Sequence, residues 1–463
     1  MGWKMLNRIF RVAIFLFSIA FLVSPKAHSD NLADALVGAY ENSGILEQNR
    51  ALLRAADEDV ATTLAALRPI LEFGASLSRS LNDPTPHVTS QNVNLIVTWL
   101  LWDNNRSNLS KQAAKETVLA TRATLLSLEQ QVLFRAIIAY LDVIRSREFV
   151  SLRENNVRLL QEELRAAQNR FELGAITRTD VALAEARLAQ ARSNLATAEG
   201  NSINSRQEYL SVVGRAPGTL SAPPTLPTRP NSIDNGKAIA VRSHPDILRA
   251  QHQLAASELR VRAARADLGP KFSLRGRLST DHSSSRQAER DSASVFLNLA
   301  QPIYQGGALS SRLRKAMVLR DSARANLLVV QKNLQQNVAT AMVRFDVATA
   351  NIEALERQIR AAEVAFQGVR EEATLGARTT LDVLDAEQEL LNARANLIAA
   401  QSELGVAAYQ IVASQGNLTA ANLGLSTQIY DPKAYYEIVK DAPGLFSEQG
   451  RQLDRILQRL DQQ

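Results

Sequence analysis

A stretch of about 200 residues occurs twice in this chain, and this duplication constrains the fold more than any other feature of the sequence. The segments LGAITRTDVALAEARLAQARSNL, from Leu173, and LGARTTLDVLDAEQELLNARANL, from Leu375, are identical at 13 of 23 positions at an offset of 202. The same offset aligns WLLWDNN, from Trp99, with QPIYQGG, from Gln301. We therefore expect one structural unit to be built twice, over residues 30–214 and 234–416.

The segments outside the repeats have their own signatures. Residues 215–233 contain five prolines, which exclude regular helix or sheet and predict a connector. Residues 417–463 form a tail that has no counterpart in the first repeat. The duplication thus divides the chain into two repeats, one connector and one tail.

The first 29 residues have the composition of a secretory signal peptide. Lys4, Arg8 and Arg11 precede an apolar run over residues 12–23, and small residues follow up to Ser29. An uncleaved membrane anchor is the alternative, but a run this short crosses ~30 Å of hydrocarbon poorly as a helix. We therefore expect residues 1–29 to be a signal peptide and the protein to be exported.

Composition excludes several classes of function. The formal charge is +6, but residues 1–29 carry four cations and no acid, so the rest of the chain has a charge of +2. Outside that segment no basic cluster is interleaved with aromatic residues, and we expect no nucleic-acid partner. The chain has no cysteine, which excludes disulfides and cysteine-held metals. The five histidines are dispersed and no phosphate loop or nucleophile motif occurs, so we expect neither an enzyme nor a metal or other cofactor.

Each repeat contains two segments in which apolar and polar residues alternate. These segments occupy residues 71–78, 92–99, 271–279 and 294–301. Strict alternation predicts strands with one apolar and one polar face, as in membrane strands that face lipid on one side and water on the other. A soluble hairpin packed on one face gives the same pattern. Export, and the absence of another predicted sheet to cover these strands, favour the membrane alternative. The polar segments 82–91 and 281–292 are expected to be loops.

Residues 104–172 and 306–374 contain no proline and predict very long helices. Each would be on the order of 100 Å long, far beyond the usual three turns, and a rod of this length needs a coiled-coil partner. The segment after each supplies one: Val383, Leu390 and Leu397 recur every seven residues, with alanines three residues later. Alanine in the seam lets antiparallel helices approach closely, although an ordinary bundle helix has similar spacing.

A turn separates each long helix from its partner. Gly174 is expected to end the first long helix, and Thr177 and Asp180 have the spacing of a capping box that begins the next. The second repeat has the same pattern from Gly376 to Asp382. Each copy of the duplicated segment, from Leu173 and from Leu375, is therefore expected to contain the tip of a helical hairpin.

Four strands cannot close a membrane barrel, whose smallest form has about eight. Closure therefore requires several chains, and two, three or four copies are compatible with the sequence. Three copies would give twelve strands, and the duplication would add pseudo-sixfold symmetry.

The repeat, the QPIYQGG segment and the LGARTTLDVLDAEQELLNARANL segment together resemble the TolC family of outer-membrane efflux proteins, over about residues 31–416. The resemblance implies a mixed fold: a homotrimer with a 12-stranded transmembrane β-barrel in the bacterial outer membrane, continued through the periplasm by a long antiparallel α-helical coiled-coil barrel. It also implies docking to a periplasmic adaptor and to an inner-membrane transporter of the ABC or RND type. The cargo would be drugs, other toxic small compounds or proteins. The tail resembles that of alphaproteobacterial members of type I secretion and multidrug export systems, and is expected to be equatorial or in part disordered.

The resemblance also assigns roles to residues of the second hairpin tip. Asp382 and Asp385 match two acidic rings at a closed periplasmic entrance, which implies a gate selective for cations. Arg378 matches an arginine that tethers this hairpin to the first at Thr179 and Asp180. From the residues alone, Asp382 could equally be a helix cap, and Arg378 a solvated charge.

One residue departs from the family pattern, and a group of cations on the third predicted strand is a further candidate site. Ala373 stands where the family has an aromatic partner in the tether. Lys271, Arg275 and Arg277 share the polar face of the third predicted strand and are expected to line the barrel lumen, or to lie near lipid headgroups.

Two other functions compete with an export channel. A periplasmic adaptor would have one hairpin inserted in small β-domains, whereas this sequence predicts two hairpins and paired amphipathic strands. A structural coiled-coil protein of the envelope would leave the four strands unexplained.

Overall fold

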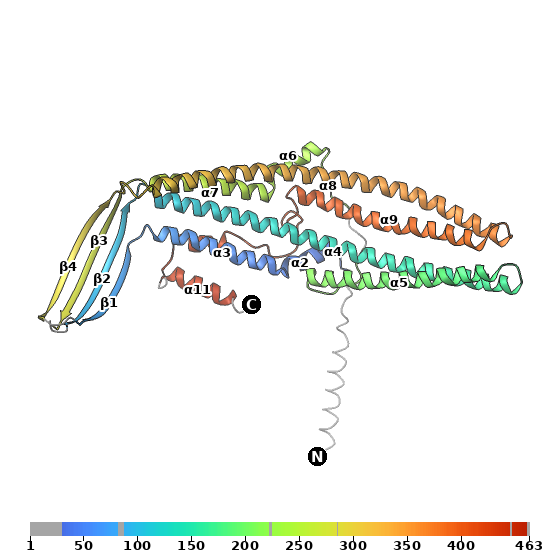
Figure 1. The fold of residues 1–463 in the computed structure, drawn as a ribbon, viewed down its shortest axis with the longest axis horizontal. Coiled ribbons are helices and arrows are strands. Elements are labelled where there is room, and N and C mark those ends of the chain that lie inside the picture. The colour runs from blue at the N-terminus through green and yellow to red at the C-terminus, as the bar shows by residue number, and fades with distance from the viewer. Residues whose placement is uncertain (1–29, 82–87, 222–224, 285, 445–446, 461–463) are drawn as a thin grey trace, which may run out of the picture. The chain divides into compact units, whose positions relative to one another are not determined.

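A computed structural model describes residues 30–463, except for residues 82–87, 222–224, 285, 445–446 and 461–463. The predicted signal peptide, residues 1–29, lies outside the described residues. Long helices and one sheet make up the fold (Figure 1). In chain order the elements are α2 (Leu32–Glu41), α3 (Gly44–Ala65), β1 (Ile70–Ser80), β2 (Val88–Trp102), α4 (Arg106–Glu172), α5 (Arg178–Val213), α6 (Ile233–Ser243), α7 (Pro245–Ala266), β3 (Lys271–Ser283), β4 (Arg286–Ala300), α8 (Ala308–Thr374), α9 (Thr380–Ser414), α10 (Ala434–Val439) and α11 (Glu448–Leu460).

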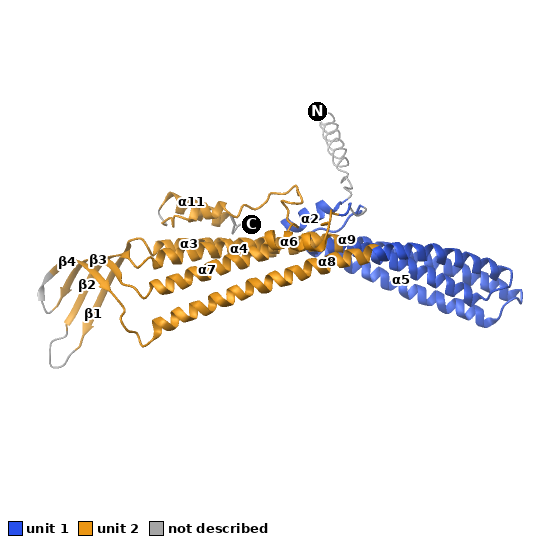
Figure 2. Ribbon diagram, turned by 90° about the horizontal axis from the view of Figure 1, so that it is seen from above, with its two compact units in different colours: residues 1–42, 135–226, 350–406 blue, residues 43–134, 227–349, 407–463 orange. Residues whose placement is uncertain are grey.

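The chain forms two compact units, and these units do not follow the two sequence repeats (Figure 2). The described residues up to 42, with 135–226 and 350–406, form the first unit. Residues 43–134, 227–349 and 407–463 form the second. Each unit therefore takes one part from each repeat, because helices of the two repeats pack side by side.

The predicted long helices are confirmed. α4 and α8 contain 67 residues each, and each contributes to both units. Their sequences are polar along most of their length. Nowhere in the described part of the chain does a helix combine the length and apolar character needed to cross a membrane.

In the first unit, two helical hairpins have alanine-lined seams as the heptads predict. Ala184 and Ala191 of α5 and Ala393 of α9 are buried. Val383 and Leu390 of α9 pack with Phe366 of α8 in one apolar cluster. A small residue at alternate seam positions allows the close approach of the two helices in each hairpin.

We expect Ala393→Leu to destabilise the first unit. Ala393 has no exposed surface, and the three carbon atoms added by leucine would force neighbouring side chains out of their rotamers, at about 1–3 kcal/mol. Thermal unfolding followed by circular dichroism should show a lower midpoint. Ala399→Leu, at an exposed position of the same helix, is the control and should leave the midpoint unchanged.

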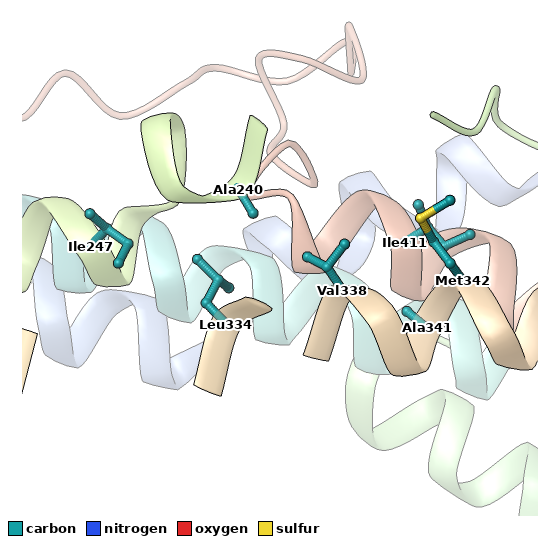
Figure 3. Close-up of a cluster of buried hydrophobic side chains, with 7 residues drawn as sticks. All are labelled: Ala240, Ile247, Leu334, Val338, Ala341, Met342 and Ile411. Atoms are coloured by element: carbon teal, nitrogen blue, oxygen red, sulfur yellow. The ribbon is translucent and has the colours of Figure 1, made fainter. Parts of the chain in front are cut away.

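The second unit has a separate apolar core (Figure 3). Val338 and Leu334 of α8 pack against Ala240 of α6 and Ile411 of α9. α6 and α7 are separated at His244, where Pro245 occupies the first turn of α7. The first turn of a helix tolerates proline, because a backbone N–H there would have no partner within the helix.

A four-stranded antiparallel sheet, with strand order β1-β2-β3-β4, belongs to the second unit. β2 of the first repeat pairs with β3 of the second, with Leu95 opposite Leu278. The apolar residues of the four strands thus form continuous rows on one face, for example Phe73, Leu95, Leu278 and Ala293. The four predicted strands are confirmed, together with their alternation.

The apolar face of the sheet is uncovered in the single chain. Phe73 is 72% exposed and Val295 is 76% exposed. The sheet is an open meander, so β1 and β4 each leave one edge without a partner strand among the described residues. An exposed apolar face of this size and two free edges both require a partner outside the chain.

The predicted loop over residues 281–292 is wrong. β3 continues to Ser283 and β4 begins at Arg286, with Thr280 donating a hydrogen bond to Asp291 across the pair at 2.8 Å. Polar composition did not end the strands because the backbone pairing continues beyond the apolar rows. Of the other predicted loop, over residues 82–91, residues 82–87 lie outside the described residues and residues 88–91 belong to β2, so the loop prediction is wrong there as well.

The tail forms two short helices that pack on α3. Tyr435, Val439 and Leu453 form an apolar cluster with Ala61. The Arg68 guanidinium donates hydrogen bonds to the Asp441 and Ala442 carbonyls at 2.6 and 2.9 Å. The tail is therefore an ordered layer over one side of the second unit.

A charged pair lies beneath this layer. Asp57 of α3 is buried, and neither of its carboxylate oxygens has a hydrogen-bond partner among the described residues. Burial raises the pKa of Asp57 to about 6, although the Arg122 guanidinium, 4.0 Å away, opposes the shift. The Arg122 side chain also stacks over the Tyr436 ring, 5.3 Å from its centroid. The face of α4 that carries Arg122 is therefore the face covered by the tail.

Candidate functional site at the hairpin tips

Both hairpin tips have the turn geometry that the sequence predicts. Gly174 and Gly376 have φ angles of 71° and 80°, in the left-handed region that glycine adopts most readily. In the first tip, the Thr177 N–H donates to the Asp180 carboxylate at 2.9 Å, and the Asp180 N–H donates back to the Thr177 hydroxyl. The first long helix is thus reversed within a few residues by a glycine stop and a capping box.

The second tip repeats this capping box. Asp382 accepts hydrogen bonds from the Thr379 N–H and hydroxyl, both at 2.9 Å. The backbone and side-chain bonds from Thr379 hold the pKa of Asp382 below its usual range, and the Arg378 charge lowers it further. Asp382 is therefore a helix cap and also a carboxylate that stays ionised at neutral and mildly acidic pH.

Arg378 is not placed at the first hairpin. Its Nε donates to the Glu372 carboxylate at 2.9 Å, within its own hairpin. The Asp180 carboxylate accepts hydrogen bonds from Thr177 in the same chain, and the tether from Arg378 to Thr179 and Asp180 stays a prediction. Ala373, at the position of the missing aromatic partner, is buried in the seam beside Phe366.

Asp385 joins the two hairpins instead. Its carboxylate accepts a hydrogen bond from the Arg187 guanidinium of α5 at 2.9 Å. Both side chains are partly exposed, so this ion pair contributes little to stability. Its consequence is electrostatic: Arg187 offsets the charge of Asp385, whereas Asp382 has no comparable partner on the first hairpin among the described residues.

A buried polar seam continues this connection between the hairpins. The Asn156 side chain of α4 donates to Glu387 of α9 at 2.5 Å, and both residues are buried. Buried Glu163 of α4 pairs with Arg370 of α8 at 3.0 Å. Two carboxylates therefore lie within one contact surface between the hairpins.

Glu387 is the most perturbed acid in this seam. Burial raises its pKa to about 7, and the hydrogen bond from Asn156 opposes that rise. The Glu163 charge raises the pKa further, while Arg187 and Arg370 lower it. Glu387 thus changes its charge near neutral pH at the surface where the two hairpins meet.

Sequence reasoning missed this polar seam. Glu387 follows the seam residue Ala386, a position that is usually charged and solvated in a coiled coil. It is buried because a second hairpin packs there, and Leu384 of α9 lies against Leu160 and Leu188 of the first hairpin. The signal available was weak: Asn156 and Glu163 are seven residues apart, on one face of α4.

The three predicted lumen cations lie on one face of β3, but they differ in environment. Lys271 forms an ion pair with Asp267 at 2.7 Å. Arg275 and Arg277 are exposed. The same face also carries Phe296, opposite Arg275, and Ile96, opposite Arg277, so it is mixed rather than wholly polar.

The described residues contain no group of three or more His, Cys, Asp or Glu side chains that could hold a metal ion.

Comparison with known proteins agrees with this geometry. Residues 36–215 and 239–417 match the family described as outer membrane efflux protein, once for each repeat. The outer membrane efflux protein BepC of Brucella suis is 34% identical over 431 residues, which cover 93% of this chain and 94% of the relative. The proteases secretion protein PrtF of Dickeya chrysanthemi is 24% identical over 417 residues, covering 84% and 88%.

Solved structures share the fold at lower sequence identity. A crystal structure of CusC, described in terms of folding and transmembrane channel formation, superposes with a TM-score of 0.75 at 20% identity. The superposition covers 83% of this chain and 91% of that one. The tandem repeat, the long hairpins and the four-stranded sheet therefore belong to an architecture seen before.

Proposed function

Because the chain belongs to the outer membrane efflux protein family and is an export channel of the outer membrane, we propose that it works as a homotrimer with a gate at its hairpin tips. Three sheets would join edge to edge into a 12-stranded barrel, and six hairpins would continue it as a helical tunnel. Solutes would pass from the periplasm to the exterior. The proposal includes no bond-forming or bond-breaking step.

The open sheet is the observation that carries this proposal. On β3 the apolar row runs from Phe272 to Leu278, about 20 Å along the strand, which is close to the ~25 Å height of the apolar band of a membrane barrel. Its two free edges lie on β1 and β4. Pairing β4 of one copy with β1 of the next satisfies both edges, and lipid would cover the apolar face.

The partners and cargo follow from the resemblance to the TolC family. We propose docking of the hairpin tips to a periplasmic adaptor and, through it, to an inner-membrane transporter of the ABC or RND type. Because one relative is named for efflux and another for secretion of proteases, both small compounds and proteins are candidate cargo. Deleting the gene, followed by drug-susceptibility and secretome profiling, separates the two.

Cross-linking across the sheet edges tests the number of copies. The chain has no cysteine, so Ser76→Cys on β1 and Ser292→Cys on β4 provide a clean pair. A flexible bismaleimide easily spans paired strands, which lie about 5 Å apart. We expect covalent dimers and trimers on a denaturing gel and no larger species. Each single-cysteine variant is the control and should remain monomeric.

The result also discriminates between functions. A ladder that ends at two or continues to four copies would contradict the trimer. A purified protein that stays monomeric, resides in the soluble periplasmic fraction and forms no pores in planar bilayers would favour the adaptor or the structural coiled-coil protein instead.

A further inference from the structure

A groove of about 680 Å³ crosses α4, α7 and α8 in the second unit. Three cations line it: Arg260 of α7, and Arg312 and Lys315 of α8. Hydroxyl and amide side chains add neutral hydrogen-bonding groups, and small apolar side chains form its floor: Thr117, Thr121, Thr124, Gln253 and Ser257, with Ala120, Ala256, Ala316, Leu319 and Ala323. A hollow of this size suits a drug-sized molecule.

The surroundings of the groove are strongly basic. The segments that line the groove, residues 106–124, 253–271 and 308–323, contain twelve lysines and arginines and four acids, of which Asp267 forms an ion pair with the groove residue Arg312. That acid is already bound by Lys271 at 2.7 Å and by Arg106 at 3.2 Å, with Arg312 at 3.8 Å. The hydrogen bond from Lys271 and the nearby cations hold its pKa below the usual range. With twelve cations and four acids, these three segments together carry a formal net charge of +8.

Helix geometry places the groove opposite the tail. Arg122 of α4 stacks beneath Tyr436 of the tail. Thr117, Ala120 and Thr124 line the groove, and each is roughly 140–160° around the helix axis from Arg122. The tail and the groove thus occupy opposite faces of α4.

These observations locate the groove in the channel. The tail covers the face of α4 that carries Arg122. A channel must stay open along its axis, so a face covered by a layer of the chain cannot line the interior. The tail side is then the outer surface and the groove side faces the interior. Arg275 and Arg277, on the face of the sheet opposite the apolar rows, would extend the cationic lining.

We infer that this groove is a transit site for amphipathic organic anions, a class of cargo that the acidic entrance does not select. This inference rests on the proposed channel function. Two arginines and a lysine bind a sulfonate or carboxylate by charge-assisted hydrogen bonds, and the alanine floor receives an aromatic or aliphatic body. A neutral molecule of the same shape lacks the charge-assisted hydrogen bonds, and inorganic phosphate lacks the apolar contact with the alanine floor.

Planar-bilayer recordings of the full-length protein test the inference. Naphthalene-2-sulfonate is the probe, with naphthalene-2-sulfonamide and inorganic phosphate as comparison ligands. We expect the sulfonate to block the current at a concentration roughly tenfold lower than either comparison ligand. The triple variant Arg260→Gln, Arg312→Gln, Lys315→Gln should raise the half-blocking concentration of the sulfonate at least about tenfold.

A matched variant controls for overall charge. Arg262→Gln, Arg265→Gln and Arg314→Gln remove three cations from the same two helices, and none of these three residues lines the groove. This variant should block like the unmodified protein. The single variant Lys315→Gln, at an exposed position, should give an intermediate shift and guards against misfolding of the triple variant.

The outcomes separate the two proposals. Equal loss of block in both triple variants, or no loss in the groove variant, would overturn the anion site while leaving the channel intact. Absence of any conductance by the unmodified protein would refute the channel, and the groove inference would fall with it.

Discussion

Replacing Asp382 and Asp385 by alanine should raise single-channel conductance and remove block by multivalent cations. Three copies would place six carboxylates around a narrow axis, which attracts and retains cations. Asp382 should contribute most, because Arg187 offsets the charge of Asp385 at 2.9 Å. We expect Asp382→Ala alone to raise the half-blocking concentration of a trivalent cation by roughly tenfold, and Asp385→Ala to raise it less.

The first hairpin provides a matched control for this experiment. Asp180 makes the same capping interactions with Thr177 that Asp382 makes with Thr379. Asp180→Ala therefore removes an equivalent helix cap from the other tip. If both variants change the block equally, the lost helix cap explains the change and a separate blocking role of Asp382 is contradicted. Arg187→Ala, which frees Asp385, should strengthen the block.

Glu387→Gln should stabilise the paired hairpins at pH 8 by up to about 3 kcal/mol. The folded-state pKa of Glu387 is raised from 4.5 to about 7, so ionisation disfavours the folded state. The penalty is absent below pH 4.5, grows between pH 4.5 and 7, and is complete above pH 7. Glutamine keeps the hydrogen bond from Asn156 and removes the charge. The unfolding midpoint of the variant should therefore exceed that of the unmodified protein at pH 8 and match it at pH 4.5.

Glu389→Gln is the control for this second prediction. Glu389 lies two residues further along α9, is exposed, and accepts a hydrogen bond from Gln358 at 2.9 Å. Its replacement should change the midpoint little at either pH. Equal midpoints for Glu387→Gln and the unmodified protein at pH 8 would show that the buried carboxylate is neutral or hydrated there, and would contradict the penalty.

Elements with a strong local period were predictable from the sequence. The long helices, the alanine seams and the four strands follow from spacings of seven and of two residues, which depend on each element alone. The turns at Gly174 and Gly376 were equally predictable, because a positive φ and a capping box leave a short signature. The resemblance to a family added the assembly and the gate, which no local pattern contains.

Features that depend on two distant segments were not predictable. The polar stretch over 281–292 continues as paired strands because β3 and β4 face each other there, not because its residues favour strand. The seam between Asn156 and Glu387 exists only because one hairpin packs on the other. Arg378 pairs with Glu372, six residues earlier, where the family pattern implies a partner on the other hairpin.

The pairing of β2 with β3 joins strands that are far apart in sequence, and this affects how the chain folds during export. These neighbouring strands are separated in sequence by the whole of α4, α5, α6 and α7. During export the first pair, β1 and β2, therefore emerges long before its neighbours, and a lone two-stranded hairpin is marginal in water. Contacts of such long sequence separation form slowly. We therefore expect the apolar strands of the newly exported chain to stay exposed until β3 and β4 have followed, an interval in which the chain is prone to aggregate.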